Sequence, residues 1–455
     1  MQKIFLNLRK HHNKIALIDN NFEKYNYSFL ADYAKKFNKC INDRSLILMI
    51  GSNQAASAIG YISFLKLNYI LILLDESFSN QYIKKLIQIY KPEYIYGEDQ
   101  RLKQINLKNH KLKCLNFLLF KTKYKKNNKI NKKNLLLVST SGSTSNPKLV
   151  RLSSMNLTDN TKKIINYLNI NSSHKTITTM PFGYSYGLSI INTHIESGGT
   201  IILNKKSVFE KDFWTIVKKY KITSFGGVPS FYELLRKLKF DKTFFPNIKY
   251  LTQAGGKLSN DLIYYYSNIK NLKFYQMYGQ AEASPRIAYL DPKKNIDKIG
   301  SIGKPLKGYK LIIKKSPLLK KENLDGEIVL HGKNVCLGYA NKKEDLSKGD
   351  ENRGKILTGD LGYKDNEGYY YITGRKKRIS KIFGLRINLD DIESLLKKYN
   401  FSSKCITSND YLKIEIKENF NENKLKKIIY DNFGIKINYI KLYQVKKFTL
   451  INMFK

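Results

Sequence analysis

Cysteine is scarce in this chain, and the four cysteines show no paired spacing that would suggest a shared site. They are Cys40, Cys114, Cys336 and Cys405. The six histidines show no metal-ligand spacing either. This pattern argues against a disulfide framework and against a zinc site, and it is typical of a protein in a reducing compartment. We therefore expect a cytoplasmic protein.

Long apolar runs are also missing. The segment MQKIFLNLRKHHNK at the start contains no extended apolar core, so we expect no secretory signal. The longest uncharged stretch covers 45–65, but it contains Ser, Asn, Gln and Gly. Its first part, SLILMI, has strand character, and the following apolar residues recur at helical spacing from Ala55 to Leu65. We predict a strand, a loop and an amphipathic helix there, and no membrane span.

Acidic residues are few: 37 Asp and Glu stand against 81 Lys and Arg, which gives a formal net charge of +44. Such an excess would suit binding to nucleic acid or to an anionic membrane. The alternative is compositional drift, since Lys, Asn, Ile and Tyr are abundant together. The basic residues are spread along the chain, and only 101–133 form a cluster, which we predict to be a solvated loop. The dispersed charge favours drift, and we expect no specific nucleic-acid partner.

The order of apolar and polar segments indicates two kinds of structure in a chain of 455 residues, long enough for two or more domains. From 45 to about 290, strand-like runs such as YILILL at 69–74 alternate with helix-period segments, one of them opened by Pro229. This alternation predicts a parallel sheet covered by helices. After about 295 the chain has antiparallel β character, and an amphipathic helix is expected from Asn388. We place a boundary near 374, giving domains 1–373 and 374–455.

A polar loop follows the apolar run NLLLV. Residues 139–150 are STSGSTSNPKLV, and they fall at the carboxyl end of a predicted strand, where ligands of parallel sheets bind. Small residues that expose backbone N–H groups, together with hydroxyls and Lys148, could hold phosphate. The alternative is a surface turn, for which the same residue types are common. The loop is not of the GxxxxGK[ST] type, because Pro147 stands at the second glycine.

Five further stretches are polar or glycine-rich where a core would not require it. They are MPFGYSYGLS at 180–189, QAGGKLS at 253–259, QMYGQAEAS at 276–284, LTGDLGY at 357–363 and GRKKRISKIFGLRIN at 374–388. Taken singly, residues such as Tyr278, Glu282 and Asp360 are more often structural than functional. Their order along the chain is the more specific signal.

In this order the stretches resemble the motifs of the AMP-forming adenylating enzymes: acyl-CoA synthetases, amino-acid adenylation domains and firefly luciferase. Thr140–Val150 resemble the family pattern TSG[ST]TGxPKxV, and Tyr278–Glu282 resemble YGxTE. Thr358–Asp360 match TGD, and Gly374–Ile387 resemble GRxxxxIKxxGxRI. The resemblance runs from about residue 14 to the end. It implies an α/β fold with a large N-terminal domain of doubly wound mixed sheets and a small β-subdomain, plus a small mobile α+β C-terminal domain.

The resemblance also implies a reaction. A carboxylic acid would join the α-phosphate of ATP, pyrophosphate would leave, and the acyl group would pass to the thiol of CoA or of carrier-protein phosphopantetheine. Attack of one anion on another needs charge neutralisation and alignment more than acid–base chemistry. The partners implied are therefore ATP, Mg²⁺, a small carboxylic acid and a thiol carrier.

The resemblance implies a ligand-binding role for each of the matching positions. Phosphate would be held by Thr140, Ser141, Gly142, Ser143, Thr144 and Lys148. Mg²⁺ would be held by Glu282 through oxygen, the ligand that this ion prefers. The nucleoside would be bound by Gly255, Gly256, Tyr278, Gly279 and Gln280 around adenine and by Asp360 at the ribose hydroxyls. Arg375 and Arg386 would reach ribose and phosphate as fixed donors.

The family alternates between two poses of its small C-terminal domain, and the turning point matches Lys377. One pose would bring Lys455 to the adenylation site, and the other would bring Lys381 and the Gly384 loop to the thiol-transfer site. With Glu282, these two lysines form the expected catalytic set.

Three departures from the family pattern stand out. Ala281 lacks a hydroxyl near the α-phosphate, and Ser145 replaces a glycine of the loop. The C-terminal P-x-x-x-x-G-K pattern is reduced to its lysine, which is the final residue, Lys455. Lys446 or Lys447 could substitute for it, or adenylation could be crippled.

The expected acyl pocket contains Gly183 and Tyr184. Amino-acid adenylation domains have an aspartate where Gly183 stands, so a simple carboxylic acid is favoured over an α-amino acid. Tyr184 would supply an aromatic wall with a polar tip. Two hypotheses remain from the sequence: an ATP-dependent acid–thiol ligase, or a degenerate family member that binds nucleotide or acyl ligand without turnover.

Overall fold

The computed structural model describes most of the chain. The described residues are 4–6, 8–41, 43–105, 107, 110–125, 129–139, 148–268, 273–315, 326–376, 379–382, 385–408, 411–445 and 448. For Lys242, Ile379, Lys381, Arg386, Asp390 and Ser408 only the backbone is described.

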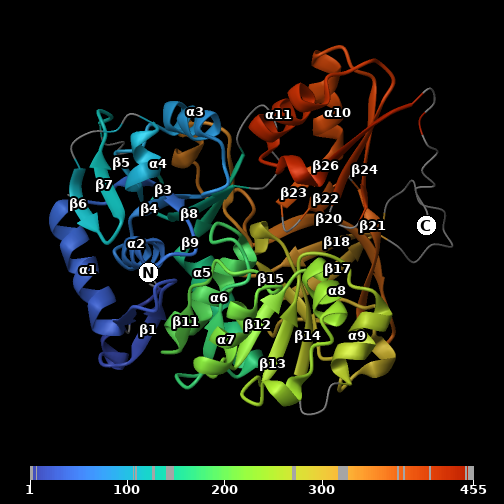
Figure 1. Ribbon diagram of the computed structural model, residues 1–455, viewed down its shortest axis with the longest axis horizontal. Helices are drawn as coiled ribbons and strands as arrows, with labels where there is room; N and C mark the ends of the chain where they lie inside the picture. Colours follow the sequence, from blue (N-terminus) through green and yellow to red (C-terminus); the bar gives the residue numbers. More distant parts are fainter. Residues whose placement is uncertain are drawn as a thin grey trace.

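Two large sheets form the body of the molecule (Figure 1). The first has eight strands in the order β19 (Gly338–Ala340), β9 (Leu149–Ser153), β8 (Asn134–Ser139), β4 (Ile70–Asp75), β3 (Leu46–Gly51), β5 (Tyr94–Glu98), β7 (Phe117–Lys121) and β6 (His110–Cys114). Its centre, β8-β4-β3-β5, is parallel and its edges are antiparallel. The parallel strands are buried along almost their whole length, as sheets covered on both faces require.

The second sheet has nine strands. Their order is β16 (Lys304–Pro305), β15 (Arg286–Leu290), β14 (Lys273–Gly279), β13 (Tyr250–Gln253), β12 (Ser224–Gly227), β10 (Lys175–Ile177), β11 (Thr200–Ile202), β1 (Ile15–Ile18) and β2 (Lys24–Asn26). The strands from β14 to β1 run parallel, while β15, β16 and β2 are antiparallel edges. The alternation of strands and helices alone predicted a parallel sheet, whereas the family resemblance implied mixed sheets; the two mixed sheets of the structure confirm the latter.

Helices cover these sheets and join them. They are α1 (Tyr27–Cys40), α2 (Ala55–Lys66), α3 (Asn80–Tyr90), α4 (Asp99–Lys103), α5 (Ser154–Leu168), α6 (Ser185–Glu196), α7 (Lys211–Lys219), α8 (Pro229–Lys237) and α9 (Asn260–Ser267). One core cluster links Met49 of β3, Ile59 of α2, Ile191 of α6 and Ile201 of β11, so α2 and α6 connect the two sheets. Pro229 is the first residue of α8, as predicted.

The helix predicted after residue 54 is present, but it is not amphipathic. Every residue of α2 from Ala55 to Leu65 is buried, because the helix has packed elements on all sides. No helix within the described residues is long and apolar enough to span a membrane.

The prediction of a solvated loop at 101–133 is wrong in part. This segment contributes the hairpin of β6 and β7 to the edge of the eight-stranded sheet. Cys114 and the run from Phe117 to Phe120 are buried, while Lys111, Lys113 and Lys121 remain exposed. The high lysine content of this segment concealed, at the level of sequence, an apolar strand whose neighbouring lysines are exposed to water.

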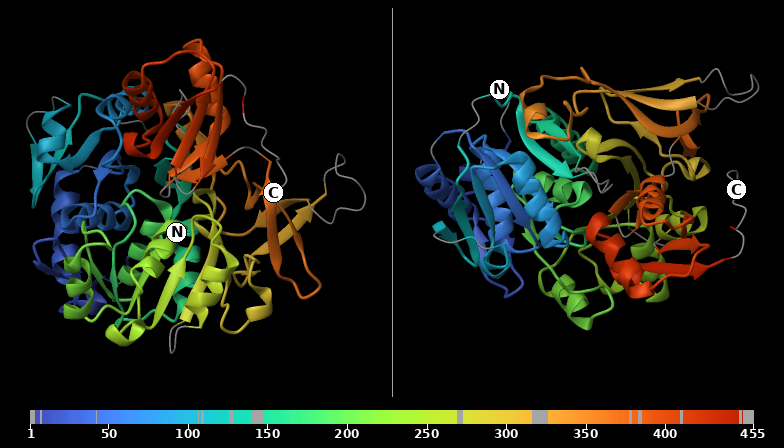
Figure 2. Two further views of the ribbon diagram at one scale, coloured as in Figure 1. Left: turned by 45° about the vertical axis from the view of Figure 1, so that its right-hand side comes forward. Right: turned by 90° about the horizontal axis from the view of Figure 1, so that it is seen from above.

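The later part of the chain forms smaller layers. An antiparallel sheet contains β17 (Lys310–Lys314), β18 (Gly326–His331), β20 (Lys355–Lys364) and β21 (Tyr370–Arg375). The C-terminal unit contains β22 (Ile379–Ile382), β23 (Leu385–Asn388), α10 (Leu389–Lys398), β24 (Ser403–Ser408), β25 (Tyr411–Ile416), α11 (Glu422–Phe433) and β26 (Ile440–Gln444). It has its own core, from Ile382 to Ile440, and Figure 2 shows it seated against one side of the body. The architecture confirms the α/β class.

Candidate active site

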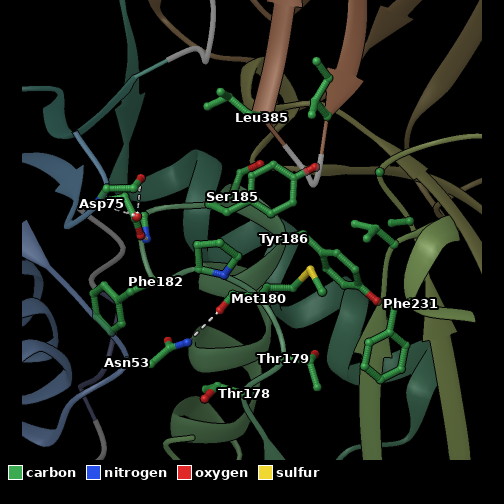
Figure 3. A pocket seen from close by; sticks show the side chains of 18 of the residues that line it. Asn53, Asp75, Thr178, Thr179, Met180, Phe182, Ser185, Tyr186, Phe231 and Leu385 are labelled. Carbon is green, nitrogen blue, oxygen red and sulfur yellow. Dashed lines mark hydrogen bonds between the residues drawn. The ribbon is translucent and has the colours of Figure 1, made fainter. Parts of the chain in front are cut away.

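A cavity of about 860 Å³ lies where strand ends of both large sheets meet the C-terminal unit. Its wall includes Asp75 at the end of β4 and residues that follow β10, β13 and β14. Leu385 of β23 and Lys436 after α11 close it from the other side. Figure 3 shows Asp75, Tyr186, Phe231 and Leu385 around this space. Carboxyl ends of parallel strands are where such sheets bind ligands.

The two residues expected in the acyl pocket, Gly183 and Tyr184, both line the cavity. The backbone N–H of Gly183 donates to Asp75 Oδ2 at 3.2 Å. A Cβ on Gly183 would lie 2.9 Å from Asp75 N, so this position has no room for a side chain. The absence of a carboxylate at residue 183 is therefore enforced by the approach of β4.

Three of the predicted nucleotide residues form a chain of contacts. The Tyr278 hydroxyl donates to Asp360 Oδ2, and Arg375 Nε lies 2.7 Å from Asp360 Oδ1 as an ion pair. Asp360 is 1% exposed, whereas the Arg375 side chain is 27% exposed and reaches the cavity. Burial, and next the Asp360 carboxylate, raise the pKa of Tyr278 well above its ordinary value, so it stays a hydrogen-bond donor.

A second chain of contacts joins Lys148 to Glu282. Lys148 Nζ lies 3.5 Å from the centroid of the Tyr339 ring, and the Tyr339 hydroxyl donates to Glu282 Oε1 at 3.0 Å. Glu282 is only 3% exposed and lies in the 3₁₀ turn Ala281–Ala283. The structure thus places a cation over the ring of Tyr339 and a carboxylate at its hydroxyl.

The predicted glycine-rich positions divide into two groups. Gly255, which has a φ of +95°, lines the cavity together with Gly279 and Gln280. Gly256 is not among the lining residues, and its carbonyl accepts from Gln253 Nε2 at 2.9 Å. Tyr278, Glu282, Lys148 and Asp360 also stand behind the cavity wall rather than in it.

Several predicted positions lie outside the described residues. They are Thr140, Ser141, Gly142, Ser143, Thr144, Lys377, Lys455 and the alternative lysines Lys446 and Lys447. The side chains of Lys381 and Arg386 are outside the description as well. Their roles stay predictions.

Sequence reasoning missed three residues of this region: Asp75, Tyr339 and Arg286. Asp75 and Tyr339 occupy apolar strands, and only strand pairing brings them to the site. Arg286 had a signal that was overlooked. It is a charged residue at the head of the buried run RIAYL, four positions after Glu282, where a strand would ordinarily begin with an apolar residue.

Residues 5–340 match the AMP-binding enzyme family. The chain belongs to this family. The match covers most of the body of the molecule and includes the loop at 140–148 and the Tyr278–Glu282 segment.

Curated relatives match over a shorter segment. An oxalate–CoA ligase of Arabidopsis thaliana is 27% identical over 266 residues, which are 57% of this chain and 52% of the relative. A 2-succinylbenzoate–CoA ligase of Bacillus cytotoxicus is 29% identical over 263 residues, 58% of this chain and 54% of the relative. The match thus spans about half the length of these relatives.

Among solved structures, the o-succinylbenzoate CoA synthetase of Bacillus subtilis has the same fold across the whole chain. With a bound product analogue it gives a TM-score of 0.79 at 17% identity, covering 100% of this chain and 96% of that one. In complex with its acyl-adenylate it gives 0.69 at the same identity, covering 99% and 95%. The fold of this chain is thus the adenylating-enzyme fold, and it superposes better on the first of these two structures.

Proposed function

We propose that this chain activates a carboxylic acid with ATP, releasing pyrophosphate, and then passes the acyl group to the thiol of CoA or of carrier-protein phosphopantetheine. The observation that carries the proposal is the Tyr278–Asp360–Arg375 chain of contacts, which connects two buried residues to a partly exposed arginine in the wall of the strand-end cavity. It supplies a carboxylate suited to ribose hydroxyls and a guanidinium suited to phosphate. Membership of the AMP-binding family supports the same chemistry.

Glu282 suits Mg²⁺. It is a buried carboxylate, and Mg²⁺ in nucleotide sites takes one or two protein carboxylates and completes its shell with phosphate and water. Bound there, the ion would supply charge neutralisation for the phosphates. The Tyr339 hydroxyl holds one Glu282 oxygen at 3.0 Å and so fixes the orientation of the carboxylate. Lys148, over the face of the Tyr339 ring, would add a second positive charge.

The thiol acceptor would enter from the C-terminal unit. This unit lines the cavity with Ile382, Leu385, Lys436 and Tyr439, so the cavity lies between the unit and the body. We propose 1–373 and 374–455 as the two domains, with Lys377 as the turning point, because the C-terminal unit has a separate core. One unit that faces the site in two poses would serve both half-reactions.

The acid itself is open, though Gly183 argues against an α-amino acid because no side chain fits there to pair with an amine. The relatives named above carry the names of oxalate and 2-succinylbenzoate. All four cysteines are free, which supports a reducing, cytoplasmic location.

ATP–pyrophosphate exchange tests the proposal. Wild type with Mg²⁺ and a pooled panel of carboxylic acids should show exchange that requires an acid, and Glu282→Gln should lower it by roughly 10²-fold. The control Glu344→Gln removes an exposed carboxylate and should leave exchange unchanged. Absence of exchange with every acid, while ATP still raises the melting temperature, would reject the proposal in favour of the alternative: a family member that binds nucleotide without turnover.

A further inference from the structure

Arg286 is a fully buried arginine that has no ionic partner within the described part of the chain. It begins β15 and is 2% exposed. Among the residues that the structure describes, no carboxylate forms an ion pair with its guanidinium, and Nε has no hydrogen-bond acceptor. The guanidinium faces the ring of Tyr186, whose centroid lies 5.2 Å from the guanidinium carbon. A buried charge in this state is costly unless something neutralises it.

Arg151 shows how this protein satisfies a buried guanidinium when the role is structural. Its side chain is also fully buried, and its nitrogens contact four backbone carbonyls, those of Leu337, Tyr339, Lys348 and Gly349. It also forms an ion pair with Glu351 at 2.5 Å. Arg286 has no comparable set, so packing alone does not account for a charge at this position.

Arg286 lines the cavity in which the substrate would bind. It lines the 860 Å³ cavity together with Tyr186 and Pro285, and it pairs across the hairpin with Gly279, which lines the same cavity. The Tyr186 hydroxyl is already engaged with Thr252, so the contact with Arg286 involves only the ring. Arg286 therefore belongs to the wall of the proposed acyl pocket, beside the nucleotide segment, and it also lines a smaller neighbouring cavity with Tyr186 and Met277.

We propose that the substrate is a dicarboxylic acid, and that its second carboxylate pairs with Arg286 while the first is activated. This rests on the proposed adenylation function. Arginine is the natural receptor for such a group, because its planar fork matches a carboxylate with two parallel hydrogen bonds. A ligand carboxylate would neutralise the Arg286 guanidinium, for which the described residues provide no carboxylate.

The other charged residues of the wall are compatible with an anionic substrate. Asp75 and Glu76 are acidic, but Asp75 is held by the backbone N–H groups of Ser77 and Gly183. Burial raises the pKa of Glu76. Lys205 and Lys436 also line the cavity and oppose this rise in the pKa of Glu76, while Lys206 is paired with Glu210 and Asp212.

The test compares each dicarboxylic acid with its own monomethyl ester. The ester keeps the length and one free carboxyl group but removes the second charge. Straight-chain diacids of increasing length are assayed by acid-dependent pyrophosphate release with wild-type protein. The best diacid should exceed its half-ester in kcat/KM by roughly 10²-fold or more, the scale for an unpaired buried charge partner. Equal use of diacid and half-ester, or preference for monocarboxylic acids, would overturn the assignment while leaving adenylation intact.

Substitution of Arg286 supplies the second measurement. Arg286→Met keeps an unbranched apolar stem and removes the charge, so the diacid-to-half-ester ratio should fall to about one, while Arg286→Lys should retain part of it. If Arg286 had a purely structural role, its loss would lower kcat/KM for the diacid and for the half-ester by the same factor, and their ratio would stay unchanged. The matched control is Arg236→Met, since Arg236 also lies 5.2 Å from a tyrosine ring but is exposed and outside the cavity. If Arg286→Met does not fold, the wild-type comparison still decides. Absence of pyrophosphate release with every acid would instead reject the adenylation on which this inference rests.

Discussion

Both carboxylate oxygens of Asp360 already have partners within the protein. Its two oxygens are engaged by the Tyr278 hydroxyl and by Arg375 Nε. A ribose that binds Asp360 must therefore displace or share one of these contacts. Arg375 is the half-exposed partner, while Tyr278 is buried and its raised pKa keeps its proton in place. We expect the nucleotide to move Arg375 toward phosphate and leave Tyr278 on Asp360.

Lys148 should matter for ATP and little for folding. One contact of this half-buried side chain is with the ring of Tyr339, and a cation–π contact is worth about 0.5–2 kcal/mol. Lys148→Ala should lower kcat/KM for ATP by roughly 10²-fold, because a phosphate-neutralising charge is lost. The melting temperature should fall by no more than about 2–4 °C.

Lys36→Ala is the control for that variant, since Lys36 makes a similar contact with Tyr33 at 4.5 Å, away from the cavity. It should leave ATP use unchanged. A large loss of melting temperature in Lys148→Ala, without a specific effect on ATP, would count against the phosphate role.

His194 should make stability depend on pH. It is 3% exposed in α6, and burial lowers its pKa from 6.5 to about 4. Between these two values the unfolded chain binds a proton at His194 that the folded chain does not. Stability should therefore fall as pH decreases from about 6.5 to 4, by up to about 3 kcal/mol, and this contribution should level off below pH 4.

Melting temperatures of wild type and His194→Asn across this range would measure the effect. The amide can still donate to Ile190 O, which lies 2.8 Å from Nδ1, but it does not titrate. Burial also lowers the pKa of His174, which adds the same trend to both proteins and cancels in the comparison. Parallel curves for the two proteins would show that His194 does not contribute.

At the scale of elements, the β14–β15 hairpin connects the nucleotide segment to the acyl pocket. Tyr278 and Gly279 end β14, the turn contains Glu282, and Arg286 begins β15. Gln280 N–H donates to Pro285 O at 2.9 Å and closes the turn. This one hairpin therefore fixes the positions of a metal candidate and a specificity candidate relative to each other.

Gly279→Ala should disrupt this hairpin. A Cβ on Gly279 would lie 2.1 Å from Pro285 O, a backbone atom that cannot move without breaking the turn. We expect a loss of several °C in melting temperature, in keeping with the 1–3 kcal/mol typical of steric overpacking. Gly374→Ala, where a Cβ meets nothing within 4 Å, should leave the melting temperature unchanged. Equal melting temperatures for both variants would contradict the close approach.

At the scale of the whole molecule, the cavity is built by two separately packed units. The body supplies strand ends, and the C-terminal unit supplies Leu385, Lys436 and Tyr439. Motion of the unit would change which of its residues face the cavity. The two half-reactions should then respond to different residues of the same unit.

Lys455→Ala and Lys381→Ala test this division. Lys455→Ala should lower ATP–pyrophosphate exchange by roughly 10²-fold and spare thioester formation from a supplied acyl-adenylate, because its charge would serve only the first step. Lys381→Ala should do the reverse. Exchange unaffected by Lys455→Ala would move the role to Lys446 or Lys447, and equal losses in both assays for both variants would contradict a two-pose mechanism.

The sequence by itself determined the order and type of most elements. The run SLILMI and the apolar spacing after Ala55 predicted β3 and α2, and Pro229 marked the start of α8, because strand and helix periodicity and first-turn proline are local properties. It also placed Glu282, Tyr278 and Asp360 in motifs. A local pattern reports which residues face a core, and this much was enough to indicate a family.

Only the tertiary structure decided what those residues contact. Tyr278 and Asp360 are 82 positions apart, and Tyr339 reaches Glu282 across 57 positions, so no spacing rule connects them. The burial of α2 on all sides and of the β6–β7 hairpin depended on neighbours from distant segments. Likewise, only the tertiary structure shows that no described carboxylate pairs with Arg286. Whether a charged residue has a partner depends on its neighbours in three dimensions. These neighbours are set only once the sheets have packed together.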